Sequence, residues 1–143
     1  MKKYILMAAA VLAMAVSCNK NDAAKKSIDD IVLTDGKISY SVNIEAPHGY
    51  QTAVEYVSEI NEFVNMGLYE TAEAVVCQAL WSTDILESKG TIEKTKTDKF
   101  MFGTNGNKEI KADETYYIAV VALDENGEFE NKDAIIITYP ETK

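Results

Sequence analysis

The chain has 143 residues, of which 47% are hydrophobic and 26% charged, and this length and composition suit one globular domain with its own core. It carries 23 acidic residues against 14 lysines, contains no arginine and has a formal net charge of −9. Because nucleic-acid binding depends on basic patches and guanidinium groups, this composition argues against a nucleic-acid partner.

Residues 1–17 have the features of a signal peptide for export. Lys2 and Lys3 give a positive start, an apolar run follows over 4–16, and small side chains precede Cys18. The run is shorter than the roughly 17–25 residues that a transmembrane helix requires. We therefore expect a signal that is removed rather than a retained membrane span.

The segment that ends at Cys18 resembles bacterial lipoprotein signals, in which the lipobox cysteine becomes the acylated first residue. This resemblance implies lipid attachment at Cys18 and a cell-envelope protein anchored in the outer membrane, on its periplasmic or surface face. Ala15 stands where the lipobox usually has leucine. The alternative is cleavage after Ala15, within the pattern Ala-x-Ala, which would release a soluble protein that still contains Cys18.

Removal of residues 1–17 leaves 12 lysines against 23 acidic residues, a formal charge of −11. Residues 18–27 contain the lipidated cysteine and a polar tether without periodicity. Acylation of Cys18 would leave Cys77 without a disulfide partner. Cys77 lies in the apolar run AEAVVCQALW, which predicts a small buried side chain rather than a nucleophile.

The first half of the domain is predicted to contain a hairpin and then a helix. Strands over 28–34 and 37–46 flank Asp35-Gly36, a strong two-residue turn signal, and the second strand alternates apolar and polar residues. Apolar residues then recur at helical spacing, which predicts an amphipathic helix over 50–66 that ends at Gly67.

The run at 70–81 fits either a helix face or a buried strand, because periodicity cannot separate the two over so short a length. A capped turn follows at 82–90. The last third is predicted to be β, with strands over 91–102, 115–123 and 133–139.

Residues 110–127, IKADETYYIAVVALDENG, resemble the end of a fibronectin type III domain. Ile110 takes the apolar position six residues before a tyrosine, and Tyr116 takes the place of the tyrosine whose hydroxyl bonds to upstream backbone. Residues 82–91 also resemble a segment between the middle strands of such repeats in Bacteroidetes-type lipoproteins. This alignment makes AVVCQAL a strand and makes 47–70 an insertion.

The resemblance implies a mainly β fold, an immunoglobulin or fibronectin type III-like sandwich over 28–143 with a helical insertion at about 47–70. The alternative is a compact α+β domain with two helices on one antiparallel sheet. The strand at 115–123 is apolar on both faces, whereas a plain sandwich wets its outer faces. We therefore expect the helix at 50–66 to cover the outer face of that sheet.

No catalytic, cofactor or metal motif is recognised in the sequence. His48 is the single histidine, so any serine or cysteine nucleophile activated by histidine would need it. A pairing of His48 with Cys77 is the dyad considered. Residues 124–133 are rich in oxygen ligands, and they are interpreted as an acidic hairpin loop, with weak calcium binding as the alternative. No cofactor is expected.

The aromatic residues are the other candidates for a site. Most are predicted to be buried, while Phe129 is predicted to be exposed between Glu128 and Glu130. An exposed aromatic ring in a loop can anchor a partner, which makes Phe129 a candidate for that role. The set considered for a peptide or sugar platform is Tyr69, Trp81, Phe100, Phe102 and Phe129.

These features together predict a non-enzymatic binding module of the cell envelope, with a protein or glycan partner that the sequence does not identify. Its recognition surface is expected in loops at the ends of the sheets. One alternative is a protease-inhibitor-like protein that acts through a loop or edge strand. The other is a small carbohydrate-active domain.

Overall fold

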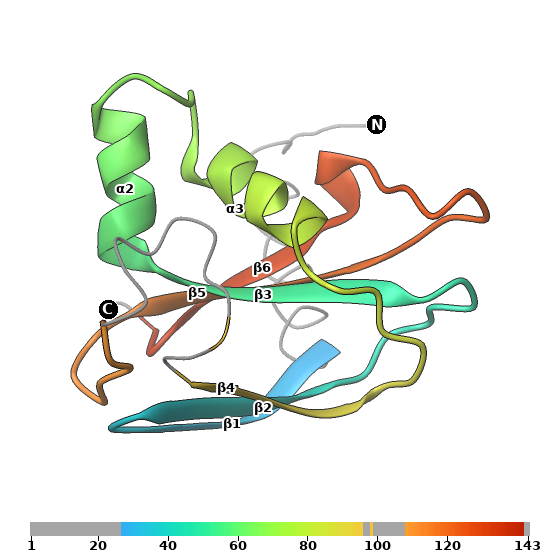
Figure 1. Cartoon of the computed structure of the whole chain (residues 1–143), viewed down its shortest axis with the longest axis horizontal. Coiled ribbons are helices and arrows are strands. Elements are labelled where there is room, and N and C mark those ends of the chain that lie inside the picture. The colour runs from blue at the N-terminus through green and yellow to red at the C-terminus, as the bar shows by residue number, and fades with distance from the viewer. Residues whose placement is uncertain (1–26, 96–97, 99–107, 142–143) are drawn as a thin grey trace, which may run out of the picture.

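The computed structural model describes residues 27–95, 98 and 108–141, which fold into two sheets and two α-helices (Figure 1). None of the described helices is long and apolar enough to cross a membrane. In chain order the elements are β1 (Ile28–Thr34), β2 (Lys37–Val42), β3 (Tyr50–Tyr56), α2 (Val57–Asn65), α3 (Ala72–Trp81), β4 (Gly90–Thr95), β5 (Tyr116–Ala122), the short 3₁₀ helix η1 (Asn131–Asp133) and β6 (Ile135–Tyr139).

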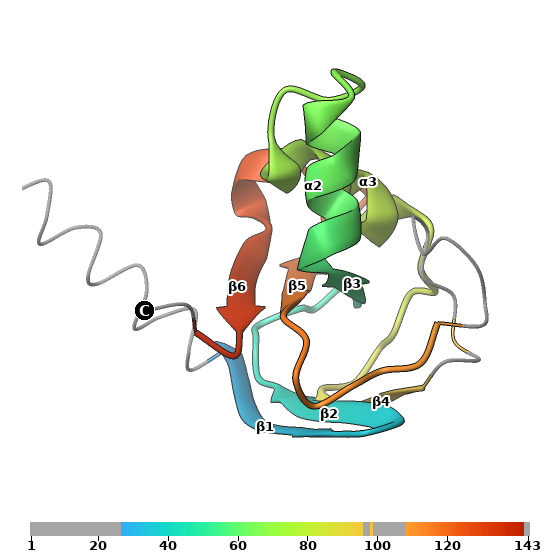
Figure 2. The ribbon, with the colours of Figure 1, turned by 90° about the vertical axis from the view of Figure 1, so that its left-hand side faces the viewer.

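Each sheet has three strands, in the order β1-β2-β4 for the first sheet and β3-β5-β6 for the second. All strand pairs are antiparallel. Figure 2 shows the first sheet beneath the second, with both helices above the second sheet. The protein is thus mainly β, and the two helices on one sheet are consistent with the α+β alternative.

Two separate hydrophobic clusters fill the spaces between these layers. The cluster between the sheets joins Ile38 and Tyr40 of β2 to Val54 and Tyr56 of β3 and to the inward residues of β5. The second cluster joins the other face of the β3-β5-β6 sheet to the helices; its buried members are Ala53, Ile60, Val75, Val76, Cys77, Ala79, Leu80, Ala119, Val121, Leu123 and Phe129.

β5 is buried on both faces, as its composition predicted. Tyr116, Ile118 and Val120 belong to the cluster between the sheets, and Ala119 and Val121 belong to the cluster under the helices. The expected helical cover is present, but α3 packs on both β3 and β5 while α2 packs on β3 and α3. The helix predicted at 50–66 therefore supplies only part of the cover.

The prediction of a helix over 50–66 is wrong for its first seven residues. Residues 50–56 form β3 and pair along their whole length with β5, from Tyr50 opposite Ala122 to Tyr56 opposite Tyr116. Tyr50, Val54 and Tyr56 lie at alternate positions of a strand and face the cluster between the sheets. Tyr50 and Val54 also fit helical spacing with Ala53, and that spacing is the reason for the wrong prediction. The helix begins only at Val57.

Residues 72–81 form helix α3, so the strand that the fibronectin alignment placed there is wrong. The Thr71 side chain caps the helix, because its Oγ1 accepts a hydrogen bond from Ala74 N–H at 3.1 Å. The two helices therefore follow β3 at 57–65 and 72–81, later in the chain than the segment expected at 47–70.

Two strands are shorter than predicted. The strand expected over 37–46 ends at Val42. The strand expected over 91–102 ends at Thr95, and most of its remaining residues lie outside the described part of the chain.

The hydroxyl of Tyr116 bonds to upstream backbone, as expected for its position. Lys111 N–H donates to Tyr116 Oη at 2.8 Å, and the hydroxyl donates to the Lys111 carbonyl at 3.3 Å. The Tyr116 side chain is completely buried and stacks at a tilt on Tyr56, with 5.0 Å between ring centroids. These contacts fix the chain that enters β5.

We expect Tyr116→Phe to lower the free energy of unfolding by about 1–3 kcal/mol, because Lys111 N–H and C=O lose their buried partner. Tyr117→Phe is the matched control, since Tyr117 lies on the other face of β5 and is half-buried. That control should change stability by less than about 0.5 kcal/mol. Urea denaturation measures both, and equal losses would contradict the assigned role of the Tyr116 hydroxyl.

Candidate functional site

Three connections meet at one end of the sheets, on the right in Figure 1: residues 43–49, 82–89 and 123–134. Backbone bonds hold them together. Tyr50 and Leu86 exchange two hydrogen bonds of 2.8 Å, and Leu123 N–H donates to the Gly49 carbonyl at 2.9 Å. We call this region the loop end.

Further contacts fix the 82–89 connection to β3. The Gln51 side-chain amide donates to the Thr83 carbonyl at 2.7 Å, and the Tyr50 hydroxyl donates to the Ser88 carbonyl at 2.9 Å. Gly49 has a φ of +96°, and a Cβ there would lie 2.9 Å from Ile85 Cγ2. A side chain at position 49 would be strained and crowded, so the loop end depends on this glycine.

The aromatic residues of the loop end differ from the prediction. Phe129 was expected to be exposed, but it is only 9% exposed and belongs to the cluster under the helices. Its neighbours Glu128 and Glu130 are exposed while the ring points inward, so the acidic flanks indicated loop position but not side-chain direction. Trp81 stacks on Phe129 with 4.2 Å between centroids and remains 42% exposed.

Trp81 is thus the exposed aromatic ring of this surface, and Phe129 is its support. Ile85, in the adjacent connection, is 55% exposed. Exposed acidic side chains at Asp84, Glu87 and Asp124 belong to the same loops. Protein-binding surfaces often combine large exposed aromatic and aliphatic side chains with a rim of polar and charged residues.

The loop at 124–133 is held by its own backbone. Asp124 Oδ1 accepts hydrogen bonds from Asn126 N–H at 2.8 Å and from Glu128 N–H at 3.0 Å. The N–H of Glu128, followed by that of Asn126, lowers the pKa of the Asp124 carboxyl. No group of three or more histidine, cysteine or acidic side chains gathers to hold a metal ion among the described residues. Asp124 therefore serves as a turn-forming residue.

Cys77 is buried in α3, as predicted, and His48 is exposed in the loop end. The Cys77 thiol points to the Asn131 carbonyl, with 3.8 Å between sulfur and oxygen, and no hydrogen bond within the described chain joins it to His48. Burial raises the pKa of the Cys77 thiol to about 11, with a smaller contribution from Glu73. These properties oppose a nucleophilic role, because the thiolate is the reactive form.

Cys77 should resist alkylation by iodoacetamide at pH 8 in the folded protein, because its raised pKa keeps it protonated and its surroundings exclude the reagent. We expect labelling at least about 100-fold slower than in the same protein unfolded by guanidinium. Peptide mass spectrometry separates Cys77 from Cys18. Equal labelling rates in the two states would contradict a buried thiol.

The opposite end of the sheets contains a shallow depression between the start of α2 and the turn before β5, lined by Val57, Ser58, Lys111, Asp113, Glu114 and Thr115. Beside it, Lys108 Nζ lies 3.4 Å from Glu59 Oε2 and 4.4 Å from the centre of the Tyr56 ring. Glu59 is almost completely buried, and the ion pair with Lys108 compensates its charge at the start of α2.

Three residues of the sequence-based hypotheses, Cys18, Phe100 and Phe102, lie outside the described residues. Tyr69 is half-buried against the cluster under the helices. The sequence does not distinguish Trp81 from the other aromatic candidates, because the apolar end of a helix gives no sign of which side chain remains exposed. Comparison with protein-family models gave no match, and searches of the curated proteins and of the solved structures gave none either.

Proposed function

We propose that this protein is a lipid-anchored lipoprotein of the bacterial cell envelope that works as a non-enzymatic binding module. Cys18 carries the acyl chains, residues 19–27 form the tether, and the domain presents its loop end to a protein partner. The observation that carries the proposal is the half-exposed Trp81, which is supported by its stack on Phe129. Ile85, in the connection that follows α3, is a second exposed apolar side chain of the loop end.

We also propose that the domain is a fibronectin type III-like sandwich. Immunoglobulin-like sandwiches have their first, second and fifth strands in one sheet and their third, sixth and seventh in the other. The orders β1-β2-β4 and β3-β5-β6 fit this pattern if α2 and α3 occupy the chain position of the fourth strand. The bonds from Tyr116 to Lys111 support the assignment.

The lipid anchor predicts that the whole protein partitions into the detergent phase and incorporates a labelled fatty acid in a bacterial host. Cys18→Ala should abolish both properties, because it removes the thiol to which the lipid is attached. Cys77→Ala is the matched control and should retain both. If the Cys18→Ala protein is still labelled, or if the intact mass shows cleavage after Ala15, the anchor is refuted.

The binding surface is tested by placing a photo-crosslinking amino acid at position 85 in cells. Position 32 is the matched control, because Val32 is 53% exposed and Ile85 is 55% exposed. Val32 lies on β1, in the β1-β2-β4 sheet and outside the loop end. We expect a defined adduct at position 85, reduced about tenfold or more by Trp81→Ala. Absence of an adduct at position 85, or the same adducts at both positions, would refute the loop end as the surface.

A further inference from the structure

We propose a second docking surface on this protein: the free edge of β6 accepts an extended segment of a partner protein as an added strand. The partner segment has successive apolar residues flanked by lysine or arginine. This surface is distinct from the loop end and concerns backbone pairing rather than the ring of Trp81. The two sheets have four edge strands, β1 and β4 in the first sheet and β3 and β6 in the second.

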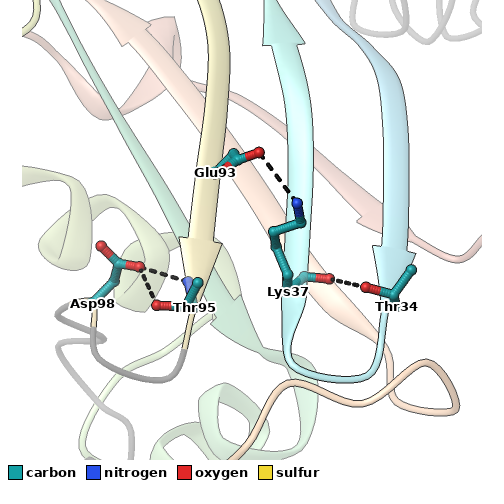
Figure 3. A network of polar contacts seen from close by, with 5 residues as sticks. All are labelled: Thr34, Lys37, Glu93, Thr95 and Asp98. Carbon is teal, nitrogen blue, oxygen red and sulfur yellow. Dashed lines mark hydrogen bonds and ion pairs between the residues drawn. The ribbon is translucent and has the colours of Figure 1, made fainter.

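Two edge strands, β1 and β4, carry charges and irregularities that oppose pairing with another chain. β1 has a break in register between Asp29 and Val32, and Asp30 has a positive φ of 52°. β4 carries Glu93, which forms an ion pair of 3.2 Å with Lys37 (Figure 3). Figure 3 also shows Asp98 just beyond the end of β4. Its carboxylate accepts hydrogen bonds from the N–H and the hydroxyl of Thr95, the last residue of the strand.

The edge of β3 is closed in a different way. All seven of its residues are buried, and Tyr50 at its start is bridged to Leu86. An added strand would have to displace the 82–89 connection, which is bonded to β3 through Gln51 and Tyr50. β3 is therefore covered by the protein itself.

β6 has none of these protections. Its sequence, Ile-Ile-Ile-Thr-Tyr, contains no charged residue, and each of its residues is half-buried. It pairs in unbroken register with β5 on one side, and no hydrogen bond from the described chain reaches its other side. An apolar edge with free backbone groups is a template for one more strand.

The faces beside β6 specify the side chains of the incoming strand. Ile135, Ile137 and Tyr139 pack against the cluster between the sheets, and Ile136 packs against the cluster under the helices. An added strand would meet apolar surface on both faces, so successive apolar residues fit it rather than an alternating pattern.

Charge favours a basic partner over a second copy of this chain. The segment 124–133, which leads into β6, holds five acidic residues and one lysine. Antiparallel pairing of two β6 strands along their full length would set Asp133 opposite Glu141 of the other copy. Like charges directly opposite each other destabilise a strand pair, whereas lysine or arginine in a partner is attracted there.

The probe for this surface is a fluorescent peptide with a short valine and isoleucine run between paired lysines, added to the purified protein. We expect saturable binding and new hydrogen-exchange protection confined to 135–139. Thr138→Lys should weaken binding about tenfold or more, equivalent to roughly 1.4 kcal/mol. Val32→Lys on edge strand β1 is the matched control and should bind as the unaltered protein does.

Two altered peptides keep the test independent of protein variants. A peptide with N-methyl groups on alternate amides should not bind, and one with glutamates in place of lysines should bind more weakly at low salt. Trp81→Ala should leave peptide binding unchanged. Failure of the proposed β6 surface is therefore distinguishable from failure of the proposed binding surface at the loop end. The inference is overturned if the N-methylated peptide binds equally, if protection appears elsewhere, or if β6 instead joins two copies in sedimentation.

Discussion

The burial of β5 on both faces is the constraint on which the rest of this structure depends. A strand with apolar side chains on both sides is stable in water only if each side meets another layer. The first sheet supplies one layer through Ile38 and Tyr40, and α3 supplies the other through Val76 and Leu80. The three-layer arrangement follows from this requirement, and both proposed docking surfaces lie at the margins of the layers.

Burial of several tyrosines and of Thr52 is tolerated because their hydroxyls have partners inside the protein; the buried tyrosines are Tyr40, Tyr50, Tyr56 and Tyr116. Thr52 links the two sheets: its hydroxyl donates to the Ala119 carbonyl at 2.7 Å and lies 2.6 Å from the Tyr40 hydroxyl. A buried polar group without a partner costs free energy, so such bonds restrict how the sheets can pack. The Tyr116 hydroxyl likewise restricts the position of the chain before β5, through its hydrogen bond from Lys111 N–H.

Sequence patterns were most informative where local signals agreed with tertiary packing. The turn at Asp35-Gly36 and the alternation of β2 predicted the first hairpin, and the double-faced apolar run predicted β5 and its helical cover. They failed at 50–56, where the same apolar residues satisfy spacings of two and of three to four. Only pairing with β5 distinguished these possibilities, and it did so in favour of a strand.

The sequence by itself determined the hairpin, the central strand β5, the position of Tyr116 and the burial of Cys77, because each has a strong local pattern. Only the tertiary structure decided that β3 is a strand, that 72–81 is a helix, and that Trp81 rather than Phe129 is exposed. The physical reason is that these outcomes depend on which surface each residue meets. Ring direction in an acidic loop and the exposure of a strand edge are set by distant neighbours rather than by adjacent residues.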